Sequence, residues 1–202
     1  FGPAIAVPVA LFLESLVAAP MLVQTRSEMR LRIVGPILAT ACATVPLGAW
    51  VLRTADPELL RRAIAAIVIV FSLLLLHGWR YAGRQRMATS IGLGALSGAM
   101  AGATSIGGPP VILYLLSGPD AIATTRANLT LFVAVTSLAA IVALWANGVL
   151  GVAAALAALA LAPGYYGGLV AGTRLFHKLS DTRFRQVTLL VLIAVSTGIL
   201  IV

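Results

Sequence analysis

The segment from Thr104 to Pro110 carries the residue types in this sequence that best suit binding chemistry. It reads T-S-I-G-G-P-P, so two hydroxyl side chains precede two glycines and two prolines. Glycine lets a ligand approach the main chain, and proline suits the first turn of a helix because it has no N–H. The N–H groups at a helix start attract anions. The pattern predicts an anion site at a half-helix; the alternative is a kink or close helix packing through small residues.

Two polar residues follow this segment at the start of the next apolar span. Arg126 could supply positive charge to an anion, or it could be an interfacial side chain that reaches toward the lipid headgroups. Asn128 lies just inside the span and could face a polar cavity. The candidate substrate-binding residues are Thr104, Ser105, Gly107, Gly108, Pro109, Pro110, Arg126 and Asn128.

Glu14 lies in the apolar sequence LFLESLV. An ionised carboxylate is costly inside a membrane, so this group is expected to be paired or protonated. We interpret Glu14 as a candidate for proton coupling during transport. A purely structural hydrogen bond, or a position nearer the interface, is the alternative.

The patterns of soluble enzymes are missing from the sequence. It contains no GxSxG, no HExxH, no Walker loop and no Cys/His metal spacing. Cys42 is the single cysteine. The sequence therefore predicts a protein that is not an enzyme, with no cofactor and no metal site.

The composition is that of a membrane protein. Hydrophobic residues make up 60% of the 202 residues, and charged residues only 10%, against roughly 25% in soluble domains. The net charge of +8 comes from basic residues between apolar spans. This distribution favours lipid headgroups as the partner of the basic residues rather than nucleic acid.

Polar and charged breaks divide the chain into apolar spans of a length that crosses a bilayer. The expected spans are residues 3–23, 33–52, 63–79, 88–116, 127–146, 150–172 and 186–202. Within the loop before the third span, Asp56-Pro57-Glu58 indicates a helix start. Span 88–116 is interrupted by the glycines and prolines described above. Because lipid cannot satisfy freed backbone groups, such a break is expected to line a cavity.

Two halves of the sequence resemble each other. FGPAIA at residues 1–6 matches SGPDAIA at 117–123, and residues 48–62 parallel residues 172–186. We therefore expect two related repeats, residues 1–87 with three spans and residues 88–202 with the broken segment plus three spans. The first repeat would lack its own broken segment, of about 30 to 50 residues, which we expect before Phe1.

The positive-inside rule favours a re-entrant hairpin at residues 88–116. If this segment crosses the membrane once, the basic residues divide almost evenly between the two sides. If it returns to its own side, eleven basic residues lie on one side and three on the other. The hairpin also makes the two repeats antiparallel, as in inverted-repeat transporters. The expected fold is an all-α polytopic membrane protein.

At these residues the chain resembles the sulfite exporter TauE/SafE family, also called the toluene sulfonate uptake permease family. The resemblance covers nearly the whole chain. Its motifs are SGAMAGATSIGGPPVILYLL at 97–116, TTRANLTLF at 124–132 and VPLGAWVLRTADPELLRRAI at 45–64. It implies a multi-pass carrier of the bacterial inner membrane that handles sulfur-containing anions such as sulfite or organosulfonates. The family's first Gly-rich segment is not present in this sequence.

The sequence thus predicts a secondary transporter, either exporter or importer, of a small sulfur-containing anion. The expected partners are this anion, the lipid bilayer and protons as a coupling ion. A passive anion channel and a non-transporting membrane scaffold or assembly factor are the alternatives. The sequence leaves the oligomeric state and the exact substrate open.

Overall fold

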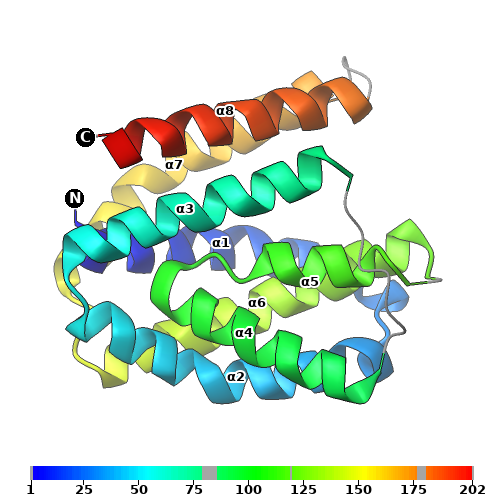
Figure 1. The fold of residues 1–202 in the computed structure, drawn as a ribbon, viewed down its shortest axis with the longest axis horizontal. Coiled ribbons are helices and arrows are strands. Elements are labelled where there is room, and N and C mark those ends of the chain that lie inside the picture. Colours follow the sequence, from blue (N-terminus) through cyan, green and yellow to red (C-terminus); the bar gives the residue numbers. More distant parts are fainter. Residues whose placement is uncertain (1, 79–85, 119, 177–180, 202) are drawn as a thin grey trace. The chain divides into compact units, whose positions relative to one another are not determined.

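The computed structural model describes residues 2–78, 86–118, 120–176 and 181–201. Figure 1 shows that the elements in this part of the chain are helices. They are α1 (Pro3–Thr25), the short 3-10 helix η1 (Arg26–Glu28), α2 (Leu31–Thr54), α3 (Pro57–Leu76), α4 (Met87–Thr104), α5 (Gly108–Leu115), α6 (Ile122–Ala146), α7 (Val152–Phe176) and α8 (Asp181–Ile201).

Five segments in the described part of the chain are long and apolar enough to cross a membrane. They are Pro3–Glu28, Leu31–Thr54, Pro57–Leu76, Ile122–Ala146 and Val152–Gly172. Each corresponds to one of the expected spans. A length of 20 to 26 residues at ~1.5 Å per residue matches a hydrocarbon core of about 30 Å. The prediction of a multi-pass helical membrane protein is confirmed.

The third span begins where the sequence pattern places a helix start. Asp56 precedes α3, and its side chain accepts hydrogen bonds from the N–H groups of Glu58 and Leu59 at 2.9 Å and 3.0 Å. Pro57 occupies the first position, where a missing N–H costs nothing. The helix therefore starts six residues earlier than the apolar span alone predicts.

The helices group into two compact units, and each is described by itself. The first contains α1, α2, α4, α5, α6 and the beginning of α7. The second contains α3, the rest of α7 and α8, with α3 packed against α8. The two units are defined by the contacts between helices and not by the sequence repeat. The division into two repeats, residues 1–87 and 88–202, therefore stays a prediction.

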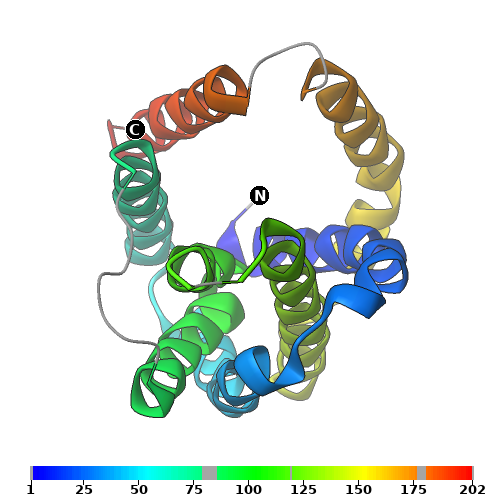
Figure 2. The ribbon, with the colours of Figure 1, turned by 90° about the vertical axis from the view of Figure 1, so that its right-hand side faces the viewer.

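Glycines bring α2 and α4 into close contact within the first unit (Figure 2). A Cβ on Gly98 would overlap the backbone of Ala41, and a Cβ on Gly102 would overlap the carbonyl oxygen of Val45. The Thr44 hydroxyl also donates to the Ala95 carbonyl oxygen at 2.8 Å, across the same interface. Small residues of this kind hold membrane helices together through close van der Waals contact. The α2–α4 pair therefore forms a tightly packed support for the segment that follows α4.

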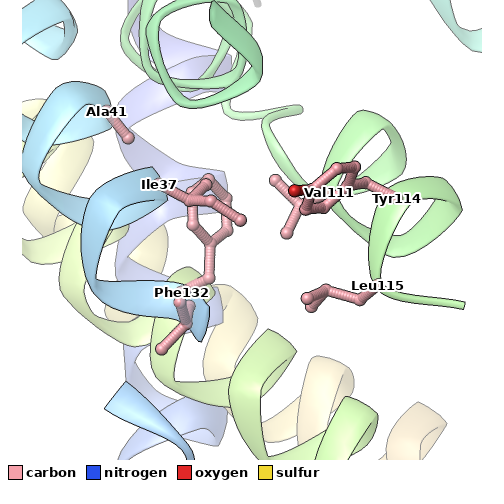
Figure 3. Packing of buried hydrophobic residues seen from close by; sticks show 7 residues of the cluster. Ile37, Ala41, Val111, Tyr114, Leu115 and Phe132 are labelled. Carbon is pink, nitrogen blue, oxygen red and sulfur yellow. The ribbon is translucent and has the colours of Figure 1, made fainter. Parts of the chain in front are cut away.

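A buried cluster fixes the short helix α5 against α2 and α6. Figure 3 shows Phe132 of α6 lying toward Ile37 of α2, with Val111 and Tyr114 of α5 on the other side. The Tyr114 hydroxyl also shares a 2.7 Å hydrogen bond with the Ser90 hydroxyl near the start of α4. The middle and the end of α5 are thereby held against the neighbouring helices.

Candidate functional site

The chain leaves helical geometry between Thr104 and Gly108, as the glycine and proline pattern predicts. Ser105, directly after α4, has the left-handed conformation (φ 60°, ψ 1°), and its N–H donates to the Ala101 carbonyl oxygen at 2.9 Å. A new helix, α5, begins at Gly108 with Pro109 and Pro110 in its first turn. Because these prolines have no N–H, they suit a helix start and not a helix interior.

Thr104 joins the two sides of this break. Its hydroxyl donates to the Met100 carbonyl oxygen at 2.8 Å and accepts the Ile106 N–H at 3.1 Å. Thr104 is buried. These two hydrogen bonds therefore hold the break between α4 and α5 in position.

The chain turns back along α4 after the break. A Cβ on Gly107 would lie 2.7 Å from the Ser97 carbonyl oxygen and 2.8 Å from the Cβ of Ala101. Only glycine allows this approach to the α4 backbone. Figure 1 shows α5 running back alongside α4, in agreement with the hydrogen bond between Tyr114 and Ser90.

A cavity of about 190 Å³ lies next to the break. Its walls come from α1, the end of α4, the start of α5 and the middle of α6. The lining residues are Glu14, Ala101, Ser105, Ile106, Gly107, Gly108, Pro109, Phe132, Val133, Thr136 and Ser137. Residues that are far apart in the sequence thus surround one small space, which the sequence pattern of a single segment cannot reveal.

The two helix ends at this cavity have opposite electrostatic character. The N–H groups of Gly107 and Gly108 begin α5 and have no preceding helical turn to donate to. This end carries a partial positive charge, and the carbonyl end of α4 carries a partial negative charge. The cavity therefore lies beside one helix end of positive and one helix end of negative partial charge.

Glu14 faces the same cavity from α1. The Ser137 hydroxyl donates to its Oε2 atom at 3.0 Å. The neighbouring Thr136 hydroxyl donates to the Phe132 carbonyl oxygen at 2.7 Å. Thr136 and Ser137 were not predicted from the sequence, because hydroxyl residues in membrane helices commonly bond to their own helix. A polar pair in the middle of an apolar span is the only signal that they give.

The predicted site residues divide into two groups. Glu14, Ser105, Gly107, Gly108 and Pro109 lie together around the cavity. The other four lie outside its described lining, with Thr104 and Pro110 buried directly beside the break, and Arg126 and Asn128 near the start of α6.

Asn128 has a structural contact that the sequence does not show. Its Oδ1 atom accepts the backbone N–H of Arg30 at 2.8 Å, just before α2 begins. Its buried Nδ2 atom has no hydrogen-bond partner in the described residues. Arg126, in contrast, is exposed in the first turns of α6. The Arg30 guanidinium, mostly exposed, lies 3.5 Å from the Asp120 carboxylate.

The comparison with protein families found a match. The family model described as "Sulfite exporter TauE/SafE" matches residues 1–199. No curated protein and no solved structure matches the chain. The family match runs from α1 into α8 and includes the break and the walls of the cavity. The protein therefore belongs to the sulfite exporter TauE/SafE family, a family of membrane transporters.

Proposed function

We propose that the protein is a secondary transporter that moves a small sulfur-containing anion, such as sulfite or an organosulfonate, across the bacterial inner membrane. The observation that carries this proposal is the start of α5, which opens into a cavity of about 190 Å³ inside a helical membrane protein. Broken helices of this kind form substrate sites in many transporters. The family match supports a sulfur-containing anion as the substrate.

The anion would bind at the amide groups of Gly107 and Gly108. Sulfite and sulfonates present several acceptor oxygens, which suit two adjacent N–H donors and a partial positive charge. Ser105 adds a hydroxyl from the same segment, and the Pro109-Pro110 turn directs the helix start toward the ligand. Thr104 would hold this segment in place through its hydrogen bonds to Met100 and Ile106.

Arg126 and Asn128 would act at a second point on the substrate path. They precede Thr136 on α6 by 10 and 8 residues, which corresponds to about 15 Å and 12 Å along a helix. The charge of Arg126 would attract the anion from the aqueous side, and the unpaired Nδ2 of Asn128 would offer a donor on the way to the cavity.

Glu14 is the proposed coupling residue. An ionised Glu14 carboxylate would repel an anion in the same cavity, so the carboxylate must be neutralised when the anion binds. Uptake of a proton by Glu14 is the simplest form of this coupling. Movement of the anion would then be tied to movement of a cation.

Alternating access would arise from two inverted repeats, with residues 88–116 as a re-entrant hairpin. Two helix pairs support this proposal. Within the first unit α1 packs against α6, and within the second unit α3 packs against α8. In the predicted repeat each of these helices packs against its own counterpart, as equivalent helices near a pseudo-two-fold axis do.

Uptake by proteoliposomes tests the proposed function. The full-length protein is reconstituted, and uptake of labelled sulfite, taurine and sulfoacetate is measured with and without an imposed pH step. Accumulation above the external concentration is the expected result. Equilibration without accumulation would favour a passive anion channel, and the absence of any uptake or ligand-induced stabilisation would favour a scaffold.

A further inference from the structure

The hydroxyl oxygens of Ser137 and Thr136 line the cavity together with Glu14, and both already donate their protons. A hydroxyl has one proton to donate and two lone pairs to accept with. The Ser137 proton is directed to Oε2 of Glu14 at 3.0 Å, and the Thr136 proton to the Phe132 carbonyl oxygen at 2.7 Å. These two hydroxyls can therefore act only as acceptors toward a ligand in the cavity.

The end of α4 adds acceptors to the same cavity. The last carbonyl groups of a helix have no intrahelical partner, and they carry the partial negative charge of the helix. Ala101 and Ser105 at this helix end line the cavity together with Glu14, and the Ala101 carbonyl oxygen, which accepts the Ser105 N–H at 2.9 Å, keeps a second lone pair. Carboxylate, hydroxyl and carbonyl oxygens are the ligands that hard cations prefer.

The number of charges limits which cation fits. Glu14 is the one charged side chain among the described residues that line the cavity. Across the described residues no group of three or more His, Cys, Asp and Glu side chains is placed to hold a metal ion. One carboxylate balances a monovalent ion, whereas a divalent ion would keep an uncompensated charge in a membrane interior. A proton bonds to one oxygen of Glu14, whereas a sodium ion can be coordinated by the Glu14 carboxylate and the lone pairs of Ser137 and Thr136 together.

We infer that the cavity binds a sodium ion at Glu14, Ser137 and Thr136, beside the anion at Gly107 and Gly108. The anion site in this inference rests on the proposed function, whereas the sodium site rests on the acceptor oxygens. The ion neutralises Glu14 and brings positive charge next to the anion. Unwound carbonyls and helix C-termini bind coupling ions in other transporters, opposite half-helix N-termini that bind the substrate.

Direct binding of radioactive sodium tests the site. The purified full-length protein is incubated with ²²Na⁺ in choline chloride, and bound label is measured while unlabelled Na⁺ or K⁺ competes. The expected result is saturable binding of one ion per chain that Na⁺ displaces much better than K⁺. Added taurine or sulfite should raise the affinity, since linked ligands favour each other's binding.

Two variants and a matched control make the test specific. Glu14→Gln should abolish ²²Na⁺ binding, and Thr136→Val, which keeps the shape and removes the oxygen, should weaken it by about tenfold or more. Thr130→Val is the control, because Thr130 lies on the same helix and donates to the carbonyl oxygen four residues earlier, at 2.9 Å, but does not line the cavity. Thr130→Val should leave binding unchanged.

The outcomes separate this inference from the proposed function. If the protein binds no ²²Na⁺ with or without sulfonate, yet accumulates the anion after a pH step, the coupling ion is the proton and the sodium site is overturned. If ²²Na⁺ binds but no sulfur-containing anion binds or moves, the sodium site stands and the transport proposal fails. Equal weakening by Thr130→Val and Thr136→Val would also contradict the site.

Discussion

Ser137 of α6 donates a 3.0 Å hydrogen bond to Glu14 of α1, and 123 residues separate the two in the sequence. Glu14 is thereby held at the cavity that also receives the start of α5. A carboxyl group in an apolar span and a broken helix are separate features in the sequence. The structure makes them two sides of one space, which is why anion binding and the charge of Glu14 should be coupled.

Glu14→Gln should uncouple transport. The amide keeps the size of the side chain but carries no negative charge for a proton or a cation to neutralise, so the anion should still equilibrate across the membrane without accumulating. Uptake by proteoliposomes under an imposed pH or sodium gradient measures this. Glu28→Gln, at an exposed position in η1, serves as the control, and accumulation that persists in Glu14→Gln would exclude the coupling role.

Gly108→Val should abolish anion binding in a folded protein. A Cβ at Gly108 meets no atom within 4 Å, so the added side chain projects into the open space where the anion is expected. Binding is measured by ligand-induced thermal stabilisation. Folding is checked first, because a side chain before a proline disfavours helical backbone angles.

Gly108→Ala is the graded variant at this position, and Gly151→Val is the control. Gly151 also has open space around it but lies in the connection before α7. Undiminished affinity in a folded Gly108→Val protein would remove the assignment of the anion site.

Gly107→Ala should behave differently from Gly108→Ala, although the two glycines are adjacent. Its Cβ would lie 2.7 Å from the Ser97 carbonyl oxygen and 2.8 Å from the Ala101 Cβ. Such overpacking costs about 1–3 kcal/mol. Reversible unfolding in mixed micelles should show a lower stability for Gly107→Ala than for Gly108→Ala, and equal stabilities would contradict the close approach of α5 to α4.

Gly98→Ala should weaken the α2–α4 interface. A Cβ at this position overlaps the backbone of Ala41, where no side chain can move aside, so a loss of about 1–3 kcal/mol in unfolding free energy is expected. Gly92→Ala, on the same helix with nothing within 4 Å, should cost nothing. The same unfolding measurement compares the two, and an equal effect would show that the interface does not depend on glycine.

Labelling of single cysteines tests the re-entrant hairpin. In a background with Cys42→Ala, cysteines placed at Arg86 and Ala121 flank α4 and α5, and both positions are exposed. If the segment returns to its own side, a membrane-impermeant maleimide should reach both from the same side. A cysteine at Gly151 should react from the other side, and labelling of Arg86→Cys and Ala121→Cys from opposite sides would overturn the hairpin and the inverted repeat.

The sequence by itself determined the local features of this protein. Apolar runs of sufficient length give membrane helices, Asp56 and Pro57 give a helix start, and the glycines and prolines at 107–110 give a break. These features depend on interactions within about one helical turn, such as a side-chain cap or a missing N–H. The residue types of that turn are therefore sufficient to predict them.

The tertiary structure alone decided which side chains meet. It brought Ser137 and Thr136 to the cavity with Glu14, and it committed the Oδ1 atom of Asn128 to the backbone of Arg30. It also distinguished Gly107, which is packed against α4, from Gly108, which faces open space. Which faces of two helices touch depends on how the helices are rotated and placed. That arrangement is fixed by packing between residues far apart in the chain, such as the glycine contacts of α2 with α4.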